Sequence, residues 1–378
     1  MLILLSVIVA LIAIKWLWTT VSTMGHGSFA GEKTEILRRR NYLVNKLATS
    51  PNIVLYEMPG GIGSQFKGEW ALYSCSMLSA SLVNISKLYP EEREGSVEQI
   101  VKLIDIVMSP ELKEYYAERW GEDPLESWGS EKSHMSYLSI LAWMISGYKE
   151  VGGDDKYDDV YYRLCSTLNW RMKKSPTLNL QTYPNEPVYV PDMLVAIVAL
   201  SNFSRQNDHL FQATVDEWLH KAKTEWKDQE TGLLKSYLDY EGKECPKPVR
   251  GSYSSLICYY LTFVDRDFAL EQYELLKKHF IQKYPLTGIR EYYDRSCWLG
   301  MDIDSGPILF NLSPTGTAFA IGPATYFDDM KFRKQLLKTA EIAGSTIRGL
   351  NTNHYLLANL ALVGEAITLA MRTSVPWA

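Results

Sequence analysis

Two carboxylates stand two residues apart in the stretch 298–327, at Asp302 and Asp304. Ser305, Gly306 and Pro307 follow at once, and this run is typical of a turn that leads into a helix, with Asp304 or Ser305 as the N-cap. Small residues then dominate up to position 324, so we expect a thin, buried segment whose backbone lies close to its neighbours. The sequence leaves two interpretations open, a carboxylate pair that performs acid–base chemistry or a helix cap beside a core helix.

A second acidic loop covers residues 183–192. Glu186 lies between an asparagine and a proline, which restrict its direction, and Asp192 directly follows a proline. Asp192 could equally be a helix cap. Hydrolysis of a glycosidic bond needs one protonated and one ionised carboxyl group, about 5–10 Å apart. We therefore predict that the catalytic acids come from these two loops and are Glu186, Asp192, Asp302 and Asp304.

His134 is a further catalytic prediction, because it precedes an apolar helical pattern. The positive end of a helix disfavours an imidazolium, so a neutral acceptor is expected there, although a simple surface histidine fits as well. Arg250 could bind a carboxylate or phosphate of a substrate, or it could bridge two loops. Flat side chains with a polar edge suit sugars, but they also pack loops onto helices. The predicted substrate-binding residues are Glu57, Trp128, Tyr183, Tyr189, Tyr237, Arg250, Tyr292 and Trp298.

The composition is that of a globular protein, with 46% hydrophobic and 22% charged residues among 378. A net charge of −5 provides no basic surface for nucleic acid, so no nucleic-acid partner is expected. Five cysteines show no zinc or redox spacing, and there is no phosphate-binding loop, dinucleotide fingerprint or metal-ligand spacing. We therefore predict no cofactor and no metal.

The first residues are almost wholly apolar, and about 20 such residues span a bilayer. The side chain of Lys15 can extend to the membrane–water interface, where the tryptophans at 16 and 18 also fit. We predict a single-pass membrane anchor at 1–22 and one domain at 23–378. Three arginines at 38–40 favour a cytoplasmic body, but large domains also cross membranes regardless of such charges, so the side of the membrane stays open.

Helical patterns fill the remainder of the chain, and strand patterns are limited to short pieces at 52–56 and 233–238. Connections alternate between short and long, as in a series of antiparallel helix pairs. The long connections contain the unusual residues, and a closed ring would bring them together at one end. The expected helices are 32–47, 67–88, 97–120 with a break at 110, 133–149, 157–173, 187–203, 208–226, 252–263, 267–281, 315–327, 330–345 and 354–371.

This arrangement resembles the alpha/alpha toroid, or six-hairpin, superfamily, which includes glycoside hydrolases, polysaccharide lyases, sugar epimerases and the linalool dehydratase/isomerase-like proteins. Two segments carry the likeness, HMSYLSILAWMISGYKEVGGDDKYDD at 134–159 and YPNEPVYVPD at 183–192. The second is similar to the loop that holds the cysteines of the dehydratase/isomerase group, where this chain has Tyr183 and Asp192 instead. The resemblance implies an all-α toroid of about six helical hairpins, preceded here by the transmembrane helix.

Three functions are compatible with these patterns. The leading prediction is a membrane-anchored, carbohydrate-active enzyme that acts on a glycan or small molecule, most simply a glycoside hydrolase with paired carboxylates in a central cleft. The alternatives are a lyase or isomerase for an apolar, terpenoid-like substrate and a non-catalytic module that binds a glycan or a partner. An open polar site would favour the first, a closed aromatic cavity the second, and carboxylates used only as helix caps the third.

Overall fold

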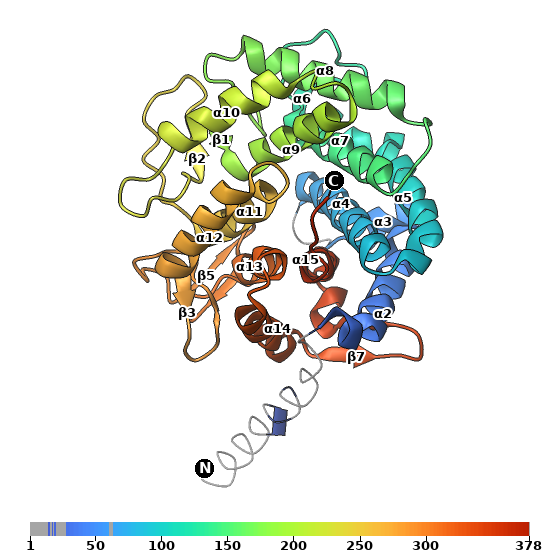
Figure 1. The fold of residues 1–378 in the computed structure, drawn as a ribbon, viewed down its shortest axis with the longest axis vertical. Helices are drawn as coiled ribbons and strands as arrows, with labels where there is room; N and C mark the ends of the chain where they lie inside the picture. Colours follow the sequence, from blue (N-terminus) through green and yellow to red (C-terminus); the bar gives the residue numbers. More distant parts are fainter. Residues whose placement is uncertain (1–13, 16, 18, 20–27, 60–62, 378) are drawn as a thin grey trace.

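The computed structural model describes residues 14–15, 17, 19, 28–59 and 63–377. Six helices form an inner ring in which each helix packs against the next, and the last packs against the first. The colours of Figure 1 accordingly run round the molecule until red meets blue. The inner helices are α4 (Ser64–Leu88), α7 (Met135–Glu150), α9 (Val190–Gln206), α11 (Gly251–Leu261), α13 (Pro314–Tyr326) and α15 (Leu362–Arg372).

Each inner helix has an outer partner, and the six pairs confirm the predicted all-α toroid. Every residue of α11 is buried, because an inner helix contacts both ring neighbours and its outer partner. Short helices α3 (Pro51–Tyr56), α6 (Pro110–Trp120), η2 (Pro90–Glu92) and η3 (Leu356–Asn359) fill connections. In the order of their inner partners, the outer helices are α5 (Arg93–Val107), α8 (Asp158–Lys174), α10 (Gln212–Thr224), α12 (Arg266–Phe280), α14 (Met330–Gly344) and α2 (Phe29–Leu47).

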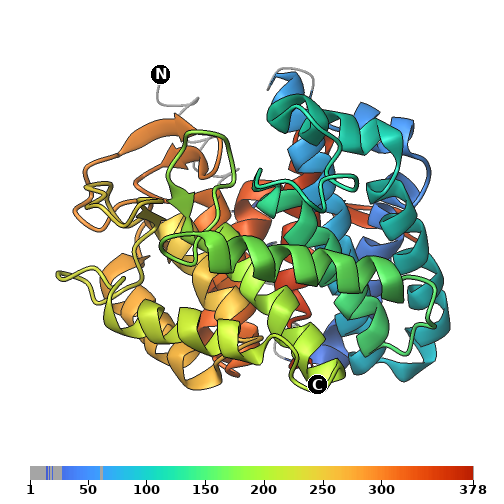
Figure 2. The same cartoon turned by 90° about the horizontal axis from the view of Figure 1, so that it is seen from above.

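The strands all lie in connections that lead from an outer helix to the next inner helix. They pair as four antiparallel two-stranded ribbons among the described residues. Because antiparallel hairpins alternate direction, these connections gather at the end of the ring where the inner helices begin, and they lie on the upper side of Figure 2. The pairs are β1 (Val188–Tyr189) with β2 (Tyr237–Leu238), β3 (Ile281–Gln282) with β4 (Gly288–Ile289), β5 (Leu299–Asp302) with β6 (Gly306–Leu309), and β7 (Thr346–Arg348) with β8 (Asn353–Tyr355).

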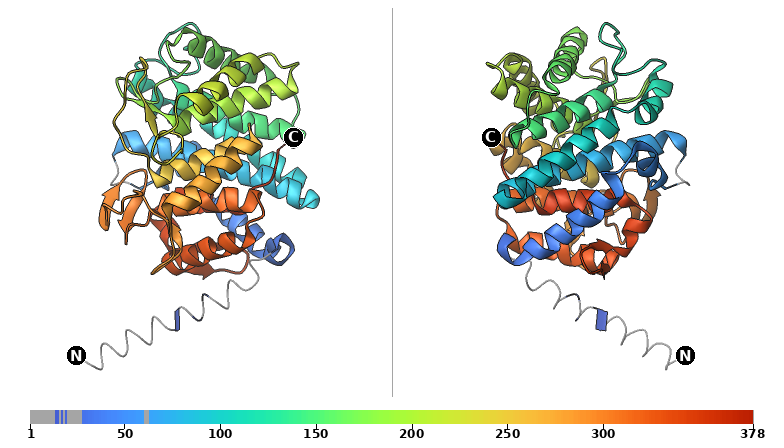
Figure 3. Two further views of the ribbon diagram at one scale, coloured as in Figure 1. Left: turned by 60° about the vertical axis from the view of Figure 1, so that its left-hand side comes forward. Right: turned by 90° about the vertical axis from the view of Figure 1, so that its right-hand side faces the viewer.

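Ring closure depends on helices from the two ends of the chain. Both views of Figure 3 show α2, in blue, beside the red C-terminal helices. Glu32 of α2 accepts hydrogen bonds from Arg333 at 2.6 and 2.9 Å and from Arg372 at 2.8 Å. Arg39, which lies further along α2, donates a hydrogen bond to Glu365 of α15 at 2.7 Å. We call this buried ion network the seam.

Two local predictions were wrong. Residues 52–56 form the helix α3 instead of a strand, because Pro51 at the first helical position is favourable for helix initiation. Neither Asp304 nor Ser305 caps a helix, since both lie in the turn between β5 and β6, and Ser313 caps α13. The prediction that the small residues of α13 let its backbone lie close to a neighbour is confirmed, because a Cβ atom on Gly316 would lie 3.1 Å from the backbone of α11.

The expected membrane anchor at 1–22 lies almost wholly outside the described residues. Within the described part of the chain, no helix is both long enough and apolar enough to span a bilayer.

The seam provides a test of ring closure. Replacing Glu32 with alanine leaves two buried guanidinium groups without their shared carboxylate, so we expect the free energy of unfolding to fall by about 3–5 kcal/mol. Urea denaturation followed by tryptophan fluorescence measures the loss. The matched control is Glu91→Ala, which removes an exposed partner of Lys33 and should change little. Equal effects of the two substitutions would contradict this role for the seam.

Candidate active site

Five carboxylates gather where the inner helices begin. Two come from inner helices, Glu69 from the second turn of α4 and Asp192 from the first turn of α9. Three come from the long connection before α13, and they are Glu291, Asp302 and Asp304. Hydrogen bonds and the electrostatic effects described below join these five groups, which we call the acid cluster.

Arg250, the residue before α11, connects three members of the acid cluster. Its Nε donates to Glu291 at 2.5 Å and its Nη2 to Asp302 at 2.8 Å. Its Nη1 donates to the hydroxyl of Tyr237 at 3.0 Å and to Asp304 at 3.4 Å. Arg250 therefore bridges loops, which was one of the two roles that the sequence left open.

Gly251 makes the approach of these loops possible. A Cβ atom at this position would lie 1.8 Å from the carbonyl oxygen of Arg290. Without it, the amide of Gly251 donates to the Glu291 carbonyl at 2.8 Å, and the hydroxyl of Ser252 donates to the Glu291 carboxylate at 2.9 Å. Glu291 is fully buried and held between Arg250 and the start of α11.

Asp302 and Asp304 differ in their protonation behaviour although only Ile303 separates them. Burial opposes ionisation of Asp302, but the hydrogen bond and charge of Arg250 outweigh it and lower the pKa of this carboxyl group. Burial raises the pKa of Asp304, and the hydrogen bond from Tyr253 at 2.8 Å only partly offsets this. Their side chains are 35% and 40% exposed, so water reaches both.

Asp192 lies in the first turn of α9 but does not cap the helix. Its oxygens accept hydrogen bonds from the hydroxyl groups of Tyr73 at 3.1 Å and Thr182 at 2.7 Å. Burial raises the pKa of Asp192 to about 6 despite these bonds, and the charge of Asp304 adds to the rise. The alternative reading of Asp192 as a helix cap is therefore wrong.

Glu69 has the most strongly raised pKa of the cluster. Burial raises it to about 7, against a hydrogen bond from Tyr183 at 2.6 Å and the charge of Arg119, while the charges of Asp192 and Asp304 raise it further. No described residue donates a hydrogen bond to its buried Oε2, which lies 3.6 Å from Arg119. A carboxyl group in this setting exchanges a proton near neutral pH.

Tyrosine rings surround the carboxylates. Tyr189 contacts the rings of Tyr183, Tyr237 and Tyr253 at centroid distances of 5.6, 5.3 and 6.1 Å. Tyr237 and Tyr253 are 5.2 Å apart. Because three of these rings also hydrogen-bond to Glu69, Arg250 or Asp304, they fix the positions of the charged groups.

Several predicted site residues join this cluster, whereas others lie elsewhere. Tyr292 is close enough for its pKa to be influenced by Arg250, and Glu186 is an exposed acid that accepts a hydrogen bond from Tyr189 at 2.7 Å. The predicted residues that the structure brings together are Asp192, Asp302, Asp304, Tyr183, Tyr189, Tyr237, Arg250 and Tyr292.

Four predicted residues make other contacts. His134 is buried next to Glu122, 3.2 Å away, and burial lowers its pKa to about 4. Glu57 pairs with Lys46 of α2 at 2.8 Å. Trp128 packs on the hydrophobic core, and Trp298 is 55% exposed beside Phe310. No contact in the described part of the chain connects these four to the acid cluster.

Sequence reasoning missed Glu69 of the acid cluster and two tyrosines that donate to its members, Tyr73 and Tyr253. All three lie inside regular helical patterns, so a search of the loops did not select them. Glu69 and Tyr253 lie near the starts of α4 and α11, and a search of the inner-helix starts for polar side chains would have found these two.

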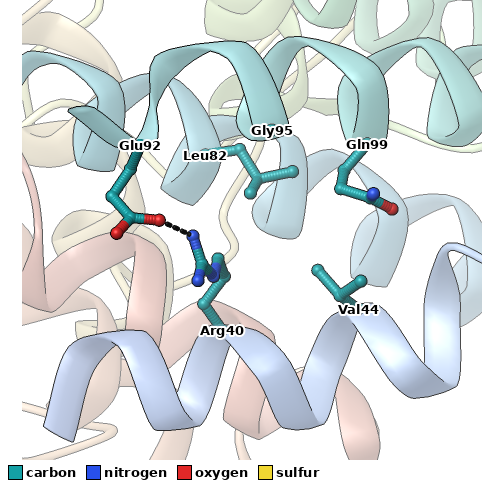
Figure 4. A pocket seen from close by; sticks show the side chains of 6 residues that line it. All are labelled: Arg40, Val44, Leu82, Glu92, Gly95 and Gln99. Atoms are coloured by element: carbon teal, nitrogen blue, oxygen red, sulfur yellow. Dashed lines mark hydrogen bonds and ion pairs between the residues drawn. The ribbon is translucent and has the colours of Figure 1, made fainter. Parts of the chain in front are cut away.

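A pocket between α2, α4 and α5 lies apart from the acid cluster. Figure 4 shows its lining, in which Arg40 pairs with Glu92 and no other carboxylate is present. Among the described residues, no three His, Cys, Asp or Glu side chains are arranged as a metal site.

No family model matches the sequence, and no curated protein matches it. Solved structures do match the fold. A family 105 glycoside hydrolase from C. acetobutylicum ATCC 824 has a TM-score of 0.54 and 11% identity, and the match covers 79% of this chain and 92% of that chain. An unsaturated glucuronyl hydrolase specific for heparin has a TM-score of 0.51 and 11% identity, covering 88% and 96%.

The chain is an alpha/alpha toroid. At 11% identity, the likeness to these two enzymes establishes the shared fold. It confirms the predicted resemblance to the alpha/alpha toroid fold. The toroid carries the acid cluster at the end where its inner helices begin.

The raised pKa of Glu69 predicts a pH-dependent stability. Between about pH 4.5 and 7 the folded state binds this proton and the unfolded state does not, so the stabilisation from Glu69 falls as pH rises. We expect the free energy of unfolding of the wild type, relative to Glu69→Gln, to fall by roughly 2–4 kcal/mol from pH 4 to 8, at 1.36 kcal/mol per pKa unit.

Urea denaturation at a series of pH values measures this difference. Tyr183→Phe serves as a second variant, because it removes the hydrogen bond that favours the ionised form and should move the midpoint to higher pH. A wild-type curve parallel to that of Glu69→Gln would contradict the raised pKa.

Proposed function

We propose that this protein is a carbohydrate-active enzyme, most simply a glycoside hydrolase that uses the acid cluster. One observation carries the proposal, namely that burial raises the pKa of Glu69, Asp192 and Asp304 where the inner helices begin, and that the charge of Asp304 adds to the rise at both Glu69 and Asp192. Paired carboxyl groups with separated pKa values are what glycoside hydrolysis requires. The names of both structural neighbours, a glycoside hydrolase and a glucuronyl hydrolase, support the same class.

The three carboxyl groups have different roles in this proposal. Glu69 is the general acid, because its pKa of about 7 keeps it partly protonated at neutral pH and its Oε2 accepts no hydrogen bond from a described residue. Asp304 is the base, since it is exposed to water and receives hydrogen bonds from Tyr253 and Arg250. The negative charge of Asp192 raises the pKa of Glu69 and so favours its protonated form.

The surroundings of the cluster favour sugar over an apolar substrate. Asp302 and Asp304 are more than one-third exposed, and hydroxyl groups of tyrosine, serine and threonine dominate the contacts. An isomerase for terpenoid-like molecules would instead need a closed aromatic cavity. Asp192, Asp302 and Asp304 do not cap helices, which removes the main argument for a purely non-catalytic module.

The tyrosines offer a binding surface for a sugar ring. Tyr189 is only partly buried and lies beside Tyr183 and Tyr237 near the charged groups, and its ring suits the apolar face and polar rim of a pyranose. Membrane attachment through residues 1–22 remains part of the proposal, and the side of the membrane on which the toroid lies is open.

Substitutions of the acids test the assignment. We expect Glu69→Gln and Asp304→Asn each to reduce kcat/KM on a glycoside by about 10²–10⁴-fold, the range typical of general acid–base catalysis. In Asp192→Asn, the loss of a negative charge should lower the pKa of Glu69 and move the alkaline limb of the pH profile to lower pH. A glycan panel assayed with wild-type full-length protein identifies the substrate.

The matched control is Asp105→Asn, a surface change on α5 beside Lys156 and Tyr157 that should leave hydrolysis intact. Unchanged hydrolysis in Glu69→Gln would exclude Glu69 as the acid. A wild-type protein that hydrolyses no glycan would contradict the proposed function as a whole.

A further inference from the structure

We propose that the sugar unit bound at the acid cluster carries no negative charge, so that the substrate is a neutral or amino-substituted glycan. This inference rests on the proposed function and names its substrate class. It follows from the balance of charges in the cluster and from the state of its cations.

Arg250 is not available to bind an anion. Four of its N–H groups already donate to Glu291, Asp302, Asp304 and Tyr237. Two hydrogen bonds from Arg250 to one substrate carboxylate would need two parallel N–H groups. Forming them would break the ion pair of Arg250 with Asp302 or with Glu291. The guanidinium therefore neutralises the protein's own acids instead of a ligand.

The other cations near the cluster do not reverse its charge. Arg119 is stacked on the ring of Tyr183 at 4.2 Å and lies 3.6 Å from Glu69. Lys247 lies on the face of Tyr237 at 4.6 Å, outside the Arg250 contacts. Glu186 adds a further acid at the Tyr189 edge. A sugar carboxylate or sulfate brought among these groups meets carboxylates whose charges already raise the pKa of Glu69 and Asp192, after the larger effect of burial.

Neutral hydrogen-bonding groups are present without partners. The hydroxyls of Tyr116 and Tyr260 are buried, with side chains 3% and 0% exposed, and no described residue hydrogen-bonds to them. Both lie close enough for the charge of Asp192 to act on them, and Glu69 also acts on Tyr116. Such hydroxyl groups both donate and accept hydrogen bonds, as sugar hydroxyls do, and they carry no positive charge to balance that of an anion.

This specificity differs from that of one structural neighbour. The unsaturated glucuronyl hydrolase is described as specific for heparin, which is a polyanion. A shared toroid does not imply a shared substrate, because specificity depends on the side chains that meet the ligand. In this chain the charged groups in and around the acid cluster are mostly carboxylates, and both nearby guanidinium groups are paired with them.

Substrate pairs that differ in one group provide the test. For each glycoside that the wild type hydrolyses, kcat/KM is compared with that of the counterpart oxidised to a carboxylate at C6 and of the 2-amino counterpart. We expect the carboxylate to be at least tenfold poorer and the amino sugar to be equal or better. Asp302→Asn replaces the ion pair with Arg250 by a neutral hydrogen bond and removes one negative charge, so it should reduce the discrimination against the carboxylate, whereas Asp105→Asn should leave it unchanged.

Equal or faster turnover of the carboxylate forms would overturn the proposal, as would an Asp302→Asn variant with undiminished discrimination. Binding of the wild type to an array of neutral, amino, uronate and sulfated glycans separates this inference from the enzymatic one. Binding to neutral or amino glycans without hydrolysis would contradict only the proposed function. Binding confined to uronate or sulfated glycans, or no binding at all, would contradict the neutral substrate.

Discussion

The ring is closed by a buried carboxylate that two distant arginines share. Glu32 lies 301 and 340 residues from Arg333 and Arg372, and its side chain is fully buried with theirs. Burying these charges costs several kcal/mol per ion, which their ion pairs and hydrogen bonds offset but do not greatly exceed. The contribution of the seam is thus mainly to specify which helices meet. Only when α15 lies between α13 and α4 can Glu69 of α4 come near Asp304.

Burial has a larger effect on the pKa of Asp192 than the dipole of the helix in which it lies. Asp192 lies in the first turn of α9, where the helix dipole favours a carboxylate by about 0.3–1 kcal/mol, which is less than one pKa unit. Its pKa is nevertheless raised from 3.8 to about 6, a shift of about two units, even with two hydroxyl donors. Burial of the carboxyl group is therefore the stronger effect at Asp192, and burial also raises the pKa of Glu69.

Local sequence patterns predicted the hairpins but not the contacts between them. Helical periodicity and loop lengths identified four complete hairpins from α7 to α14, because both signals act over a few residues. The pairing of α2 with α15 depends on buried ion pairs more than 300 residues apart, which no local pattern encodes. Asp192, Asp302 and Asp304 were found because they lie in loops or beside prolines. Glu69 was missed because its neighbours are helical. His134 lies at the start of α7 as expected, but it is buried beside Glu122 and contacts no member of the acid cluster among the described residues.

Arg250 determines which acids remain free to exchange protons. Its ion pairs hold Glu291 and Asp302 next to a permanent positive charge, and these two carboxylates serve to orient the guanidinium and the loops. Its contact with Asp304 is longer, at 3.4 Å, so this carboxylate is shared with Tyr253 and with solvent. Glu69 and Asp192 receive hydrogen bonds only from hydroxyl groups among the described residues, which stabilise an anion less than a cation does. One arginine thereby divides five similar groups into a structural pair and a reactive three, and the reactive three come from three different hairpins of the ring.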